Sequence, residues 1–396
     1  MELLVYSPHP TARLRYVCEV LAAHLRVSIR FLDEPPLQAD RPLLSIGHAI
    51  PGATYLAPSP LLEAGATGPA PAPHDLLGQL FWLLAEPWAY PAAAPTLDAH
   101  GRPVPPEWHQ QPVLQLAVAS LLASLQQQWP GFRPPGHGFR PLLTFDIDHP
   151  WAYRHKPYWR RLGSLGRDLM QGRTRELWAR LRPTDPLDPR RYLAHWPAEQ
   201  LVFFWLASRA HRWDNGLTLA HPALQRLIKH VQQAGVACHP HPGYRSGLEP
   251  AELRAQLAQW QQHLGQPLAS RQHFLRYSYP DTFRTLLAAG VRADWSAGYA
   301  GRAGYRHGTS HPFYWYDCER EETTPLLRVP FAAMDRALHQ QGLDPEQALL
   351  VVRLQAEEQR SLGGPLCLLL HNAIGSELYE WRGWSAFYTG LQALLR

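Results

Sequence analysis

The sequence contains very little lysine. Lys156 and Lys229 are the only lysines among 38 basic residues, so arginine carries almost all of the positive charge. Arginine binds carboxylates and phosphates, but it is equally an ordinary solvated surface residue. The net charge of +5 permits an anionic partner, yet the basic residues are mostly interleaved with acidic ones. We therefore expect no nucleic-acid partner.

Long hydrophobic runs are also missing. Even residues 113–125 are interrupted by Gln115 and small polar residues, and a membrane helix needs roughly 18 uninterrupted apolar residues. The N-terminus lacks the basic start and apolar run of a signal peptide. The four cysteines show no Cys-x-x-Cys spacing, which suits a reducing compartment. These absences predict a cytoplasmic protein with no integral membrane segment.

The composition predicts a globular protein of two parts. Hydrophobic residues make up 45% of the 396 residues and charged residues 18%, which is enough to build a sizeable core. The segment 130–141 contains four prolines and three glycines, a composition typical of a boundary between domains. We expect a smaller α/β accessory domain of unknown function at 1–140 and a larger domain at 141–396.

The N-terminal part has a short α/β pattern. We expect strands at 3–6 and 27–32, and a helix at 11–25 between them. A loop rich in alanine, proline and glycine follows at 65–73, and the spacing of apolar residues predicts further helices at 76–84 and 113–129.

The C-terminal part alternates short apolar runs with stretches of helical period. We predict seven strands, at 142–147, 201–206, 235–238, 269–274, 291–295, 326–331 and 366–370. Helices are expected at 159–181, 222–234, 250–264, 280–289, 345–360 and 384–395. Such alternation indicates parallel β/α units, arranged either as a barrel or as a doubly wound sheet.

Polar side chains recur at the carboxyl ends of four of these strands, where β/α folds build their active sites. Residues two apart in a strand share a face. The strand-end residues are Asp146 and Asp148, His239 and His241, Arg271 and His273, and His371 and Asn372. Each motif alone also has a structural explanation, such as a helix cap, an exposed turn or a simple ion pair. Their convergence favours a hydrolytic or metal centre.

The residue types suit attack of water on an acyl carbon. A carboxylate and imidazoles can hold a divalent cation, which polarises a carbonyl and lowers the pKa of bound water. A second carboxylate can remove a proton from the water. An imidazole from another strand can protonate the leaving nitrogen.

Several segments together resemble the polysaccharide deacetylases, the NodB-like carbohydrate esterase family 4 superfamily. Leu-Thr-Phe-Asp-Ile-Asp at 143–148 resembles their first motif. A bacterial branch of the superfamily is similar at 241–246, 270–276, 298–309, 312–317 and 370–372, and its uncharacterised N-terminal domain resembles the residues around 98–102. The resemblance implies a distorted seven-stranded (β/α) barrel that removes an N- or O-acetyl group from a sugar.

The resemblance also implies a role for each strand-end residue. Asp146 would be the catalytic base and Arg271 the residue that orients it. Asp148 and His241 would bind a divalent metal, which we expect to be zinc from the nitrogen and oxygen ligands. His371 would be the general acid.

Two departures from the family pattern affect the metal site. Ile147 separates two aspartates that are usually adjacent. Arg245 stands four positions after His241, where a second histidine is usual. His239 is the substitute ligand that we predict, and His273 is an alternative ligand or acid.

The remaining predictions concern substrate contacts. We expect a carbohydrate to contact His273, Tyr244, Asp294, Trp295 and Asn372. The aromatic residues at 305, 314, 315 and 316 either stack on sugar rings or, as is more common, fill the core. The segment 154–191 holds eleven basic and four acidic residues. It is either a solvated amphipathic helix or a surface that faces an acidic glycan or an anionic membrane.

The sequence therefore predicts a deacetylase-like hydrolase. Two alternatives remain open at this point. One is a carbohydrate-binding or glycan-assembly protein that keeps the barrel without a complete metal site. The other is a metal amidohydrolase that uses His239 and His241 as a His-x-His pair.

Overall fold

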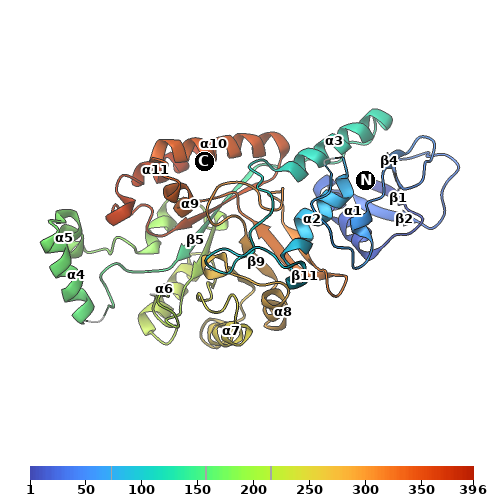
Figure 1. Cartoon of the computed structure of the whole chain (residues 1–396). Helices are drawn as coiled ribbons and strands as arrows, with labels where there is room; N and C mark the ends of the chain where they lie inside the picture. Colours follow the sequence, from blue (N-terminus) through green and yellow to red (C-terminus); the bar gives the residue numbers. More distant parts are fainter. Residues whose placement is uncertain (73, 157, 215) are drawn as a thin grey trace.

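The computed structural model describes residues 1–72, 74–156, 158–214 and 216–396. The chain has a mixed α/β fold with three β-sheets in which most neighbouring strands are parallel (Figure 1). None of the helices in these residues has the length and apolar character needed to cross a membrane.

The first sheet belongs to the N-terminal region. Its parallel strands are ordered β2-β1-β3-β4. Helix α1 (Ala12–Leu25) begins after Thr11, whose hydroxyl accepts a hydrogen bond from the Leu14 amide at 3.1 Å, and α2 (Leu76–Ala85) and α3 (Val113–Gln128) follow. The predicted strands and helices of this region are present, and two further strands were not predicted. The strands are β1 (Glu2–Tyr6), β2 (Ser28–Leu32), β3 (Leu43–Ile46) and β4 (Thr54–Leu56).

The second sheet is the central one. It is parallel throughout, with the order β12-β13-β5-β6-β7. Its inner strands are apolar runs buried on both faces, as expected for a parallel sheet covered by helices. The strands are β5 (Arg140–Ile147), β6 (Leu201–Trp205), β7 (Ala237–Pro240), β12 (Ala333–Met334) and β13 (Pro365–His371).

The third sheet has the order β10-β11-β9-β8, with an antiparallel pair β10–β11 at its edge. Its strands are β8 (Ala269–Ser270), β9 (Ala293–Ala297), β10 (Phe313–Asp317) and β11 (Glu322–Pro330). Strand β10 was not predicted. Its Trp315 and Tyr316, and also Tyr305, are fully buried, so these rings fill the core and are not a platform for sugars.

Backbone hydrogen bonds join the second and third sheets. The amide of Arg271, after β8, donates to the carbonyl of Pro240 in β7 at 3.4 Å, and the amide of His273 donates to Pro242 at 3.1 Å. On the other side, the amide of Ala332 donates to Cys367 in β13 at 2.8 Å. The carboxyl ends of β5, β7, β8 and β13 therefore open onto one region.

Helices connect and cover these strands. A single helix was predicted at 159–181, but Gly172, at a φ of 60°, separates two helices. These two, α4 and α5, lie at the end of the molecule opposite the N-terminal sheet (Figure 1). The helices are α4 (Tyr158–Met170), α5 (Thr174–Leu181), α6 (Pro222–Gln233), α7 (Pro250–Leu264), α8 (Asp281–Ala288), α9 (Asp335–Gln340), α10 (Pro345–Leu362) and α11 (Ser385–Leu395).

The N-terminal region shares its core with the third sheet. Phe313 and Tyr316 of β10 belong to the hydrophobic cluster formed by α1, α2, α3 and the first sheet. An ion pair joins the buried Arg13 of α1 to the partly exposed Glu321 at 2.6 Å. The two regions are thus packed together through apolar side chains and charge.

Candidate metal centre

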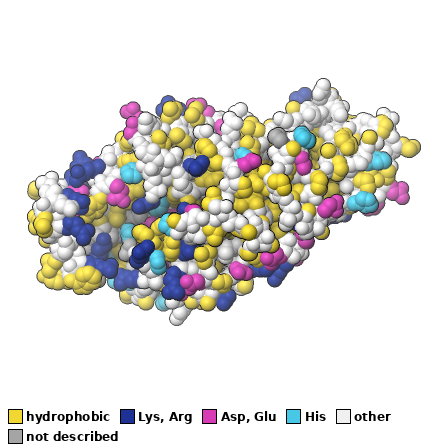
Figure 2. Space-filling view, viewed as in Figure 1, with side chains coloured by type: hydrophobic (Ala, Val, Ile, Leu, Met, Phe, Trp, Pro, Cys, Tyr) yellow, Lys and Arg dark blue, Asp and Glu magenta, His cyan; other side chains and the backbone are white. Residues whose placement is uncertain are grey.

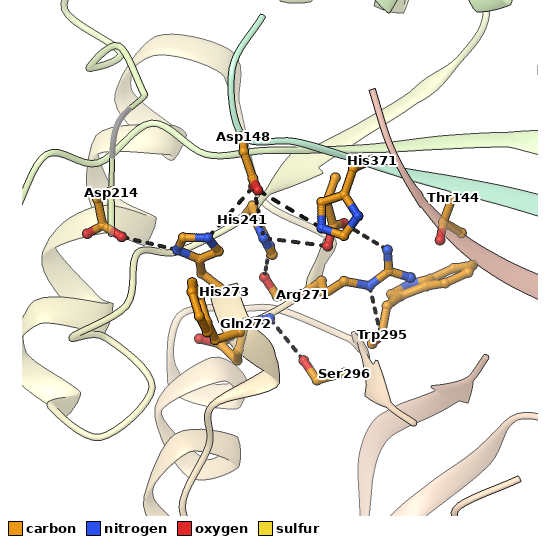
Figure 3. A network of polar contacts seen from close by, with 12 residues as sticks. Thr144, Asp148, Asp214, His241, Arg271, Gln272, His273, Trp295, Ser296 and His371 are labelled. Atoms are coloured by element: carbon orange, nitrogen blue, oxygen red, sulfur yellow. Dashed lines mark hydrogen bonds and ion pairs between the residues drawn. The ribbon is translucent and has the colours of Figure 1, made fainter. Parts of the chain in front are cut away.

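Polar side chains from several strands meet at the carboxyl end of the central sheet. Asp146 is near the end of β5, with Asp148 two residues on. His241 directly follows β7, and His371 ends β13 opposite Asp146 in the strand register. Figure 3 shows Asp148 facing the rings of His241, His273 and His371. The structure therefore brings together residues that are far apart in the sequence.

Three of these residues have the arrangement of a metal site. Single ligand atoms of Asp148, His241 and His273 all lie within 4.8 Å of one another. The Nε2 atoms of His241 and His273 are 3.7 Å and 3.8 Å from Oδ1 of Asp148. Both imidazoles are buried and Asp148 is partly buried. One carboxylate and two imidazoles are common zinc ligands.

The second nitrogen of each imidazole is already engaged. Nδ1 of His241 is 2.7 Å from the carbonyl oxygen of Arg271, and Nδ1 of His273 is 3.1 Å from Oδ1 of Asp214. If Nδ1 carries the proton and donates it in these bonds, each Nε2 keeps a free lone pair that faces Asp148. This is how ligand imidazoles are usually oriented.

Asp148 is held ionised at this site. Burial alone would raise its pKa, but the neighbouring His273, His371 and His241 hold the pKa well below the usual range of an aspartate. Burial lowers the pKa of His241 and so favours its neutral form. Oδ1 of Asp148 is buried without a hydrogen-bond partner among the described residues. An ionised oxygen without such a partner, facing the Nε2 atoms of two imidazoles, fits a divalent cation, because a buried charge is costly unless it is paired.

A buried ion pair lies next to this group. The Arg271 guanidinium donates to Oδ1 of Asp146 at 2.8 Å, and its Nε donates to the carbonyl of Trp295 at 2.9 Å. The ring of Phe204 packs against the guanidinium at 4.3 Å. The other oxygen of Asp146 is 3.5 Å from Nε2 of His241. Asp146 is thereby fixed in orientation beside the three possible ligands.

On the opposite side, His371 is paired with a second buried carboxylate. Asp335, the first residue of α9, is 2.7 Å from Nδ1 of His371 and also accepts the His371 amide at 2.7 Å. Burial alone would lower the pKa of this imidazole, but Asp335, Asp148 and Asp146 raise it to about 9. His371 is therefore protonated at neutral pH. Its Nε2 is 4.0 Å from Asp148.

Sequence reasoning missed both Asp214 and Asp335. Asp335 had a usable signal, because it directly follows a short strand in the same way as the predicted site residues do. Asp214 lies in an irregular segment between β6 and α6, where no periodic pattern marks its position. Only the folded chain shows that it is adjacent to His273.

His239 differs from the prediction that it completes the ligand set. Its ring packs near Phe204, and burial lowers its pKa to about 4. His273 occupies the place that we had expected His239 to fill. Arg245, at the position where a second histidine is usual, is exposed and pairs with Glu249 at 3.0 Å.

Two of the five predicted substrate residues, His273 and Asn372, line the cleft over the site, whereas Asp294, Trp295 and Tyr244 are not among its lining residues. Asp294 is fully buried and pairs with Arg328 at 2.9 Å, so it is not open to a substrate. Trp295 contributes its backbone carbonyl to Arg271. Tyr244 bonds His100 at 3.0 Å and its amide donates to Asp214. The amide group of Asn372 holds the carbonyls of His149 and Leu187.

A cleft of about 990 Å³ opens over the site. Asp146, Asp148, His241, His273 and His371 all line it. The N-terminal region contributes to its wall through two residues, and further aromatic and basic side chains surround it. These are His100 and Arg102, then Trp151, Tyr153, Trp159, Trp213, Phe274, Tyr379, Trp381, Arg154, Lys156, Arg160, Arg167, Arg209 and Arg336.

Comparison with known proteins does not identify a family for this chain. No protein-family model matches the chain, and no curated protein matches it.

Proposed function

We propose that this protein is a metal-dependent hydrolase that removes acetyl groups from an acetylated sugar or glycan, as in the polysaccharide deacetylases that its motifs resemble. One observation carries the proposal. The buried Asp148–His241–His273 group has an oriented carboxylate, Asp146, on one side and a protonated imidazole, His371, on the other. These are the parts that acyl hydrolysis requires.

The proposed fold is a distorted barrel of seven strands, formed by β5, β6, β7, β8, β9, β11 with β12, and β13. The hydrogen bonds from Arg271 to Pro240 and from Ala332 to Cys367 support closure between the two sheets. A barrel also explains why the polar strand ends converge, since active sites of β/α barrels form at the carboxyl face.

Asp148, His241 and His273 would hold the cation, and zinc suits their one oxygen and two nitrogen ligands. A divalent cation held there would supply polarisation of the acetyl carbonyl and activation of water. Asp146 accepts the proton of the attacking water, and Arg271 keeps that carboxylate oriented. His371 donates a proton to the leaving nitrogen or oxygen, and Asp335 stabilises its charged form.

The cleft supports a carbohydrate as the substrate. Exposed aromatic side chains such as Trp213 and Tyr379 line it and offer faces for sugar rings. The four cysteines are free, which supports the expected cytoplasmic location.

Acetate release tests the proposal. Purified protein is loaded with Zn²⁺, Co²⁺ or Mn²⁺ and incubated with acetylated sugars and oligosaccharides. We expect metal-dependent release by the natural protein and at least about a hundredfold less by Asp146→Asn, because general-base catalysis contributes 10²–10⁴-fold. Arg245→Gln, which removes an exposed charge outside the cleft, is the control and keeps full activity.

Two results would contradict the proposal. One is equal release by the natural protein and Asp146→Asn. The other is a protein that binds no divalent metal and releases no acetate, which would favour the carbohydrate-binding alternative. Metal content is measured by elemental analysis for every variant, so that loss of the base is separated from loss of the metal.

A further inference from the structure

Helices α4 and α5 expose large apolar side chains to solvent. Their exposed fractions range from 48% for Leu162 to 90% for Met170. The exposed residues are Tyr158, Trp159, Leu162, Leu169, Met170, Trp178 and Leu181. A cluster of this size on a soluble surface marks a site of interaction. We call these two helices and their exposed side chains the α4–α5 platform.

The platform has the reverse of the usual burial pattern. Among the described residues of α4 only Asp168 is buried, and α5 buries Glu176 and Ala179. Asp168 pairs with Arg180 at 2.5 Å, and Glu176 pairs with Arg382 at 3.1 Å. The acidic side chains thus hold the helices to each other and to the body of the protein, while the apolar side chains face outward.

Because the acids point inward, the outer surface is positive. All four acidic residues of 154–191 are buried, including Asp185, which accepts the amides of Ala152 and Tyr153. Figure 2 shows Lys and Arg side chains gathered with hydrophobic ones at this end of the molecule. The exposed basic residues are Arg154, Lys156, Arg160, Arg161, Arg167, Arg175, Arg182 and Arg190.

We propose that the α4–α5 platform binds the surface of a bilayer that contains anionic phospholipids. Tryptophan and tyrosine favour the interfacial region of a membrane, and leucine and methionine side chains can enter the acyl boundary. Arginine side chains bind lipid phosphates, and Arg160, Arg161 and Arg167 form no ion pair with any acidic side chain that the structure describes. The arginines of the platform are therefore complementary to the anionic headgroups of the bilayer, and its exposed apolar side chains are complementary to the hydrocarbon.

Other occupants match the surface less well. A second copy of the chain would bring like charges of two platforms together, which is repulsive. A nucleic acid would leave the apolar side chains in water. A solvated helix would carry its apolar residues on the buried side, which is the opposite of what α4 does.

The position of the platform gives membrane binding a role. Trp159, Arg160 and Arg167 line the mouth of the cleft as well as the platform. Binding to a bilayer therefore places the cleft at the lipid surface, within reach of a glycan attached to a lipid. The binding itself does not depend on the proposed hydrolysis, so the two are tested separately.

Sedimentation with vesicles tests the platform. The full-length protein is mixed with vesicles of phosphatidylcholine alone, or of phosphatidylcholine with an equal amount of phosphatidylglycerol. We expect binding to the mixed vesicles only, weakening as salt is added. The triple variant Arg160→Gln, Arg161→Gln, Arg167→Gln should bind about 100-fold more weakly, since each basic residue near the surface contributes about fivefold.

Two further variants separate charge from apolar contact. A control triple variant, Arg41→Gln, Arg133→Gln, Arg320→Gln, removes the same charge from exposed arginines outside the platform and should bind as the natural protein does. Trp178→Ala with Leu181→Ala leaves every charge in place and should also weaken binding.

Three outcomes would overturn the proposal. They are absence of sedimentation with the mixed vesicles, equal binding of the platform variant and the control variant, and self-association of the protein that the platform variants abolish. The last result would identify a second copy of the chain as the occupant. Circular dichroism of each variant establishes that it is folded.

Discussion

Replacing Asp214 by asparagine tests whether the structure assigns the metal ligands correctly. Asp214 accepts from Nδ1 of His273 at 3.1 Å, and no other side chain that the structure describes bonds this nitrogen. Burial would raise the pKa of Asp214, but the His273 side chain, the Tyr244 amide and Ser208 lower it, so the carboxylate is charged. Asparagine keeps the shape of the side chain and removes this charge.

The expected loss follows from the role of such partners. Removing the group that orients a ligand imidazole typically weakens metal binding by about 10–100-fold, which is about 1.4–2.7 kcal/mol. His241 offers no equivalent test, because its partner is the backbone carbonyl of Arg271. His273→Ala removes the ligand itself and should weaken binding further than Asp214→Asn.

The assay is competition for Zn²⁺ or Co²⁺ against a chromophoric chelator. Ser208→Ala is the matched control, because Ser208 bonds the other oxygen of Asp214 at 2.9 Å and does not touch His273. We expect the affinity to fall in the order natural protein and Ser208→Ala, then Asp214→Asn, then His273→Ala. Natural affinity in Asp214→Asn, or an equal loss in Ser208→Ala, would refute the proposed ligand set.

Two predictions concern stability. Arg271→Gln leaves the buried Asp146 without its cation and should lower the free energy of unfolding by about 3–5 kcal/mol in urea, whereas Arg245→Gln should leave it unchanged. Burial, together with His24 and His137, lowers the pKa of His311 to about 3. An unfolded histidine titrates near 6.5, so stability falls as the pH drops below that value, by about 2 kcal/mol at pH 5 for this group. His311→Phe should show a smaller decrease in stability between pH 7 and pH 5, and an equal decrease would refute the assignment.

Strands β5, β6 and β13 of the central sheet were predictable because they are apolar runs of strand length, whereas the two-residue strand β12 was not predicted. Residues 142–147 and 366–370 differ from β5 and β13 by at most two residues at either end. Strand β8 was predicted too long. It ends at Ser270, and Phe274 and Leu275 adopt φ values of 60° and 53°, in a turn that follows Arg271 and His273. The pattern of residue types does not report such a local turn.

The site was predictable only where polar residues follow recognisable strands. Asp146, Asp148, His241, Arg271 and His371 satisfied that condition, and the structure brings them together. Their supporting carboxylates are 36 and 59 positions away from the imidazoles that they orient. The contact of Asp214 depends on how an irregular segment folds over the strand ends, and apolar periodicity carries no information about such segments. Asp335 instead follows strand β12 directly, as the predicted residues follow their strands, and was overlooked.

The shared core described above also affects the order in which the chain can fold during synthesis. Domains usually fold as units while the chain emerges from the ribosome, starting from the N-terminus. Here the N-terminal cluster needs Phe313 and Tyr316 to be complete, and Arg13 needs Glu321. The apolar surface of the first 140 residues is therefore covered only after nearly 200 further residues have been synthesised. During that interval the exposed apolar surface can aggregate, so a version cut after residue 140 should aggregate.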